Sequence, residues 1–147
     1  MLTVFVLAIG LNFCSVDDLG CRQNSSCQVS GFSIGDVEGV SYGLSQYCDG
    51  KRHKFVFEAR PSQSRGTTEW HEIDKMYIGT GDKALIIASD GLCRIHGKRD
   101  PEIFAMVRPD DVQYWRAIKA WRADRKQRKI VRVSARGVDC ENEGYGA

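Results

Sequence analysis

The sequence runs twice through the same order of features, and this internal repeat limits the folds that the chain can adopt. The segment Phe55–Pro61 (FVFEARP) has a counterpart 48 residues later in Ile103–Pro109 (IFAMVRP). Further along, Cys93 corresponds to Cys140 at an offset of 47. The two offsets differ so little that changes in loop length between the halves explain the difference. One structural plan should therefore explain both halves.

Strand-like segments begin and end each half. In Lys54–Ala59 apolar and polar side chains alternate with period two, and Glu102–Val107 (EIFAMV) occupies the same place in the second half. Ala84–Ala88 (ALIIA) is a continuous apolar run, which is typical of a strand shielded on both faces. Lys129–Arg136 again alternates. Each half is thus predicted to contain two strands.

The segment between the two strands of the first half has helical spacing. Thr67 can cap the helix N-terminus, and Trp70, Ile73 and Tyr77 would then share one face. A first helix is therefore expected to follow Thr67 and to end near Gly79.

The second half has a similar segment between its strands. Asp110 is a capping residue after a proline, and Trp115, Ile118 and Trp121 recur every three residues. A strand–helix–strand unit used twice is the split βαβ pattern. We therefore predict a single α+β domain over residues 31–147 with a ferredoxin-like fold, preceded within Gly31–Cys48 by one or two short glycine-rich strands.

Six cysteines are many for a chain of 147 residues, and disulfide bonds explain them best. They form no CxxC pair, so no structural metal or other cofactor is expected. In the ferredoxin-like strand order 4-1-3-2 the last strand lies beside the first, which predicts a Cys48–Cys140 bond. Cys93 would then pair with an N-terminal cysteine, and a Cys93–Cys140 bond would contradict that order. The N-terminal cysteines are Cys14, Cys21 and Cys27.

The N-terminus points to export. Residues 1–13 are largely apolar and have the length of a signal-peptide core, although the first basic side chain is Arg22. Either this is a truncated signal, which we favour, or Thr3–Ile9 is a buried strand. Residues 14–30 form a polar, cysteine-containing lead-in. The apolar run in residues 1–13 is too short for a transmembrane span. The cysteines indicate the periplasm or the extracellular space.

Positive charge is concentrated in one segment. Residues 115–136 carry nine Lys and Arg against Asp124 alone, a balance of +8 in a chain of net charge +2. One interpretation is a binding site for an anionic partner such as an acidic protein, a glycan or a nucleic acid. The other is a solvated turn that the acidic tail, residues 139–143, partly neutralises. The candidate binding residues are Arg125, Lys126, Arg128, Lys129 and Arg132.

Two functional hypotheses follow. The first is a small exported, disulfide-stabilised, non-enzymatic binding or accessory domain whose partner the sequence does not identify. The second is a secreted hydrolase that uses the predicted helix around His71, where Glu69, Glu72 and Asp74 would lie close by. A second histidine at metal-binding spacing is missing, so we assign no catalytic residue and favour the first hypothesis.

Overall fold

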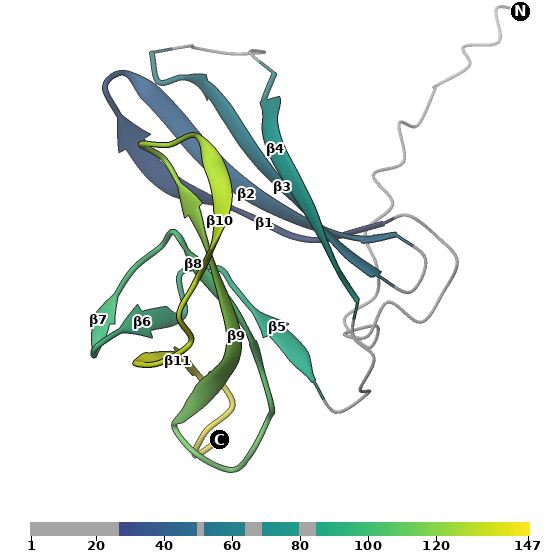
Figure 1. The fold of residues 1–147 in the computed structure, drawn as a ribbon, viewed down its shortest axis with the longest axis vertical. Coiled ribbons are helices and arrows are strands. Elements are labelled where there is room, and N and C mark those ends of the chain that lie inside the picture. Colours follow the sequence, from purple (N-terminus) through teal and green to yellow (C-terminus); the bar gives the residue numbers. More distant parts are fainter. Residues whose placement is uncertain (1–26, 50–51, 64–68, 80–84) are drawn as a thin grey trace, which may run out of the picture.

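The protein is built from β-strands. The computed structural model describes residues 27–49, 52–63, 69–79 and 85–147. Every regular element within these ranges is a strand, and the strands form two antiparallel sheets (Figure 1). The predicted α+β, ferredoxin-like fold is therefore wrong. The same ranges contain no helix long and apolar enough to cross a membrane.

The first sheet is a four-stranded meander in the order β1-β2-β3-β4. Its first turn, Glu38-Gly39, has positive φ at both residues, 49° and 78°, which matches the type I′ turn of tight hairpins. β1 starts before the end of the expected lead-in, and the predictions for residues 1–26 lie outside the described residues. The strands are β1 (Cys27–Val37), β2 (Val40–Asp49), β3 (Arg52–Pro61) and β4 (His71–Gly79).

The second sheet has seven strands in the order β5-β8-β9-β11-β6-β7, and β10 also pairs with β9. The long strand β9 pairs with β11 near its start and with β10 near its end. The strands are β5 (Ile86–Ala88), β6 (Cys93–Ile95), β7 (Lys98–Arg99), β8 (Ile103–Val107), β9 (Tyr114–Asp124), β10 (Lys129–Val133) and β11 (Val138–Glu141).

The two sheets share an aromatic core. Phe55 of β3 stacks on Phe104 of β8 with ring centroids 4.6 Å apart, and Phe104 stacks on Trp121 of β9 at 5.7 Å. A second core lies on the opposite face of β8, where Ile103 and Val138 are buried. All five residues of β8 are buried because this strand faces both cores.

The first predicted helix is wrong, because residues 71–79 form the strand β4. Its backbone pairs with β3, and its side chains alternate: Ile78 is buried in the core, whereas Tyr77 is 41% exposed. Ile73 packs against the core as well. Ile73 and Tyr77 therefore do not share one face of an element, although their spacing would place them together on a helix.

The second predicted helix is wrong as well. In β9, Trp121 packs in the aromatic core, Trp115 packs against the second core, and Ile118 is 45% exposed. These side chains occupy three environments, although they recur every three residues. A strand that is buried on both faces, as the end of β9 is, loses the period-two signal that identifies strands.

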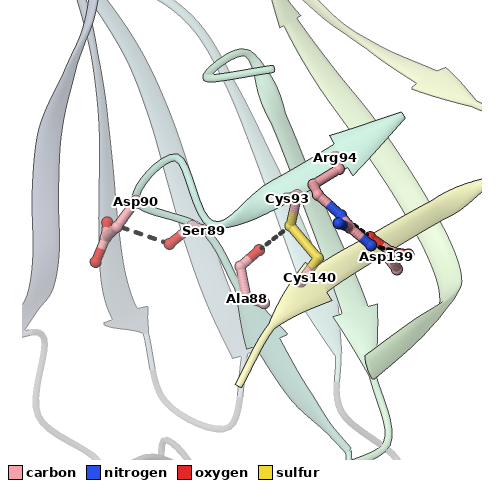
Figure 2. The surroundings of a disulfide bond; sticks show 7 residues. All are labelled: Ala88, Ser89, Asp90, Cys93, Arg94, Asp139 and Cys140. Atoms are coloured by element: carbon pink, nitrogen blue, oxygen red, sulfur yellow. Dashed lines mark hydrogen bonds and ion pairs between the residues drawn. A yellow bond between two sulfur atoms is a disulfide. The ribbon is translucent and has the colours of Figure 1, made fainter. Parts of the chain in front are cut away.

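The disulfide pairing predicted between Cys48 and Cys140 is also wrong. Cys140 in β11 lies directly opposite Cys93 in β6, and the two form a disulfide inside the second core (Figure 2). Both are fully buried. Cys48 is disulfide-bonded too, to a cysteine other than Cys93 and Cys140. The Cys93–Cys140 bond contradicts the predicted strand order, and the acidic tail begins within β11.

The strand predictions fare better. Lys54–Ala59, Glu102–Val107 and the first residues of Lys129–Arg136 coincide with β3, β8 and β10. Ala84–Ala88 contains only the short β5, which pairs with β8 at the edge of the sheet. The internal repeat has no counterpart in the sheets, because β3 and β4 belong to the first sheet whereas β5, β6 and β8 to β11 belong to the second. Its equivalent cysteines bind each other.

Candidate functional site

The predicted basic residues surround the hairpin of β9 and β10. The turn between them is closed by Asp124, whose Oδ1 accepts a hydrogen bond from the backbone N–H of Gln127 at 2.8 Å. The Gln127 side-chain amide donates to Oδ2 at 2.9 Å. These bonds, the backbone N–H first, hold the pKa of Asp124 below its usual value. The turn ends at Arg128, which has a positive φ of 55°. A charged carboxylate thus fixes the hairpin shape.

Arg125 is tied to the protein itself. Its Nε donates to Glu102 Oε1 at 2.7 Å, and its backbone N–H donates to the same oxygen at 3.1 Å. The other oxygen of Glu102 accepts from Arg122 at 2.8 Å. Glu102 stands just before β8, so this contact anchors the hairpin turn to the adjacent strand.

Glu102 is only 8% exposed. Burial raises the pKa of Glu102, but the hydrogen bonds from Arg125 and Arg122 outweigh it, so that the pKa lies below its usual value. Glu102 is therefore charged at neutral pH and neutralises part of the basic segment. An Arg125 guanidinium held in this way has little freedom to bind a partner.

Arg128 is also occupied. Its guanidinium lies 5.9 Å from the centre of the Tyr42 ring, and its Nη1 is 3.3 Å from the Tyr42 hydroxyl. Tyr42 belongs to β2 of the first sheet and is buried. Asp74 of β4 adds a second link, because it accepts a hydrogen bond from the Ile130 N–H at 2.7 Å. The hairpin is thus attached to both sheets.

Four of the five candidates are exposed, Arg128 among them. Three of these four have side chains without a hydrogen bond, ion pair or ring contact to another described side chain, and we call them the exposed trio: Lys126, Lys129 and Arg132. Within the described ranges none of the three has an ion pair with a carboxylate. Lys129 and Arg132 belong to β10, which pairs with β9 alone in these ranges. The five predicted residues therefore all lie on one hairpin, where Arg125 is held by Glu102, Arg128 is exposed but contacts Tyr42, and the exposed trio has no carboxylate partner among the described residues.

The acidic tail does not neutralise the hairpin. Asp139 binds Arg94 of β6 through two hydrogen bonds of 2.6 and 2.8 Å, a bidentate pair visible in Figure 2. Glu141 forms an ion pair with Arg99 of β7. β11 pairs with β6, whereas β10 pairs with the end of β9. The carboxylates of Asp139 and Glu141 therefore bind cations of β6 and β7 and not those of the hairpin.

The acid–base cluster expected around His71 is not assembled. In the strand β4, Glu72 pairs with Lys75 at 2.9 Å on the exposed side. Asp74 is engaged by the Ile130 N–H, and His71 is exposed. In the described part of the chain, no group of three or more His, Cys, Asp or Glu is placed to hold a metal ion.

The sequence interpretation missed Glu102 and Tyr42. Both are distant along the chain from the basic segment, so only the fold reveals their contacts with Arg125 and Arg128. A weak signal exists for Glu102, because a carboxylate directly before a fully apolar strand is often buried and then needs a cation.

Comparison with known proteins identifies no relative: no protein-family model, no curated protein and no solved structure matches this chain. The functional argument therefore rests on the residues themselves.

Proposed function

We propose that the protein is a small exported, non-enzymatic binding module that holds an acidic glycan on the exposed trio of the β9–β10 hairpin. The observation that carries the proposal is the division of the basic segment. Arg125 and Arg128 fix the hairpin, whereas Lys126, Lys129 and Arg132 have no carboxylate partner among the described residues.

Electrostatics supports an anionic partner. Cations on one edge strand raise the local potential and attract a polyanion, and each contact releases counterions from it. Lys129 and Arg132 leave opposite faces of β10, so a polyanion that contacts both would lie along the edge of the sheet. The hairpin is also attached at Glu102, Tyr42 and Asp74. Binding on such a support costs little conformational entropy in the protein backbone.

A glycan is favoured over a nucleic acid by the side chains available. Single-stranded nucleic acids are usually held by aromatic rings on which the bases stack. Two aromatic residues beside the hairpin cations are buried: Trp121 pairs with Arg132 in the strand register, and Tyr42 already lies beside Arg128. The buried disulfide Cys93–Cys140 adds weak support for an oxidising compartment, where acidic glycans are common surface polymers.

Heparin is the probe that tests this function. The variant Lys126→Ala/Lys129→Ala/Arg132→Ala should bind immobilised heparin at least about tenfold more weakly than the wild type, since each lost cation removes a favourable contact. The matched control removes three exposed cations outside the hairpin turn and β10: Lys98→Ala/Arg116→Ala/Arg136→Ala. It should bind within about threefold of the wild type.

Three outcomes would contradict the proposal. Equal loss in both variants would mean that net charge alone governs retention. Unchanged heparin binding in the trio variant, together with aggregation, would assign these cations to protection of the edge strand β10, a common role of lysine on sheet edges. Tighter binding to single-stranded DNA than to heparin would favour a nucleic acid partner.

A further inference from the structure

The solvent-facing side of the first sheet carries a hollow of about 380 Å³ that is separate from the hairpin. The floor of the hollow is formed at two glycines of the sheet, which have no side chains to fill the space above them. Gly31 of β1 pairs with Ser45 of β2, and Gly43 of β2 pairs with Ser33 of β1. Because the missing side chains lie on neighbouring strands, the gap is continuous. We call it the glycine hollow.

Aromatic rings form two walls of the glycine hollow. Trp70, just before β4, lies over Gly43, and a Cβ on this glycine would meet the Trp70 ring at 3.4 Å. Tyr47 of β2 lines the hollow as well. Trp70 and Tyr47 are both half-buried. Aromatic rings on the solvent face of a sheet are unusual unless they cover a neighbour or contact a partner.

The protein's own cations hold these rings. The Arg60 guanidinium lies 4.4 Å from the centre of the Trp70 ring, and the Lys54 ammonium lies 5.8 Å from that of Tyr47. These contacts reduce the freedom of both rings before any ligand binds. Neither cation is among the described residues that line the hollow, but each already contacts the ring that a cationic ligand would use.

The polar residues that line the described part of the hollow are Gln28, Ser33, Ser45 and Glu58. Ser45 donates a hydrogen bond of 2.9 Å to Glu58 Oε2, and Ser45 is 7% exposed. Glu58 belongs to β3 and is the one acidic residue among the described residues that line the hollow. An anionic ligand would be repelled by this carboxylate, whereas a ligand hydroxyl can donate to it.

From this arrangement we infer that the glycine hollow is a binding site for an uncharged saccharide. Sugar rings present C–H groups that pack on the electron-rich face of an aromatic ring, and hydroxyls that bind carboxylates and hydroxyls. Rings, carboxylate and hydroxyl all border one open space in the protein. A flat, open hollow suits a chain of sugars that lies along the surface.

The site binds the saccharide and does not cleave it. Hydrolysis of a glycosidic bond generally requires two carboxyl groups on either side of the bond. Among the described residues that line the hollow, Glu58 has no second carboxylate beside it. The inference is independent of the hairpin proposal, because it uses none of the exposed trio.

Isothermal titration with uncharged oligosaccharides tests the inference on the full chain. The probes are cellohexaose, chitohexaose, xylohexaose and mannohexaose, and we expect at least one to bind. Trp70→Ala and Glu58→Gln should each weaken that binding by at least about tenfold. Gly31→Leu removes no binding group but fills the floor, where the nearest atom is the flexible Gln28 amide. It should weaken binding equally.

The matched control is Tyr77→Ala, which removes an exposed aromatic ring of β4 that does not line the hollow. It should bind as the wild type does, and circular dichroism of each variant should show the wild-type fold. Absence of binding by all four probes at millimolar concentration would overturn the inference. So would wild-type affinity in Trp70→Ala and Gly31→Leu.

Discussion

Glu102 and Arg125 are joined twice, because the side chain and the backbone N–H of Arg125 both donate to one carboxylate oxygen of Glu102, at 2.7 and 3.1 Å. The contact fastens the turn of the β9–β10 hairpin to the start of β8. It also removes one cation from the set available to a ligand. The same carboxylate therefore shapes the candidate site and limits it.

Glu102→Gln should lower the free energy of unfolding by about 2–3 kcal/mol, since Arg122 and Arg125 would lose a buried charged acceptor. Urea unfolding at neutral pH measures the loss. The control Glu143→Gln changes an exposed carboxylate and should stay within about 0.5 kcal/mol of the wild type. A Glu102→Gln protein as stable as this control would show that the contact is not structural.

Removal of the disulfide should be more costly. The Cys93–Cys140 bond joins residues 47 apart in the sequence, and the loss of such a loop constraint costs about 4 kcal/mol. Cys93→Ala/Cys140→Ala should therefore unfold at a much lower urea concentration, with the loss measured under non-reducing conditions. Peptide mapping of the wild type should recover the two cysteines in one linked fragment. A loss below about 1 kcal/mol would contradict the assigned role.

Stability should fall in mild acid because of His53. This side chain is 2% exposed, and the Gln46 amide nitrogen lies 2.9 Å from its Nδ1. Burial lowers the pKa of His53 below its usual value of 6.5, so the unfolded chain takes up the proton first as the pH falls. The stabilisation is complete above about pH 6.5 and is lost as the pH drops through the pKa of the folded state.

Urea unfolding at about pH 7.5 and about pH 5.5 measures this loss, which is at most about 1.4 kcal/mol per pH unit. His53→Gln should flatten the dependence between these values. His71→Gln changes an exposed histidine and should leave it intact. Equal pH dependence in wild type and His53→Gln would exclude this histidine as the cause.

Gly137 is constrained by its φ of +78° and by its neighbour, since a Cβ there would lie 2.5 Å from His96 Cε1. Gly137→Ala should therefore lose about 2–3 kcal/mol of unfolding free energy. Gly39→Ala is a matched control, because Gly39 has the same φ of +78° and open space around it. It should lose only about 1 kcal/mol. Equal losses in urea unfolding would mean that the His96 ring moves aside.

The sequence predicted the strands with clear patterns and failed where both faces are buried. Lys54–Ala59 alternates because β3 has one face in the core, so its prediction is confirmed. In β9, Ala120 and Trp121 are consecutive and both buried, one in each core. Apolar side chains on both faces, together with residues of high helix propensity, imitate a helix.

Turn residues contained a signal for part of the fold. Glu38-Gly39, Asp90-Gly91 and His96-Gly97 all have positive φ at both positions, as type I′ turns require. Glu38-Gly39 and His96-Gly97 close the hairpins β1–β2 and β6–β7, whereas the strands on either side of Asp90-Gly91, β5 and β6, do not pair. None of these turns lies in the two segments predicted as helices, so they would not have excluded the helices. The pairing of Cys93 with Cys140 follows from strand register, which the sequence alone does not reveal.

The sequence predicted which basic residues lie at the candidate site but not which of them contact other parts of the protein. All five basic residues lie at the hairpin, yet Arg125 and Arg128 are engaged by Glu102 and Tyr42. Long-range partners of this kind have no local signature in the sequence. The glycine hollow was missed for the same reason, because Gly31, Gly43 and Trp70 meet only after β1, β2 and β4 have paired in one sheet.

The salt dependence of heparin affinity tests the central claim most directly, since it counts the cations that contact the polyanion. If the exposed trio makes those contacts, replacing Lys126, Lys129 and Arg132 with alanine should reduce the slope of log affinity against log salt by about 2–3. The Lys98→Ala/Arg116→Ala/Arg136→Ala control should keep the wild-type slope. An unchanged slope in the trio variant, or an equal reduction in the control, would contradict the account.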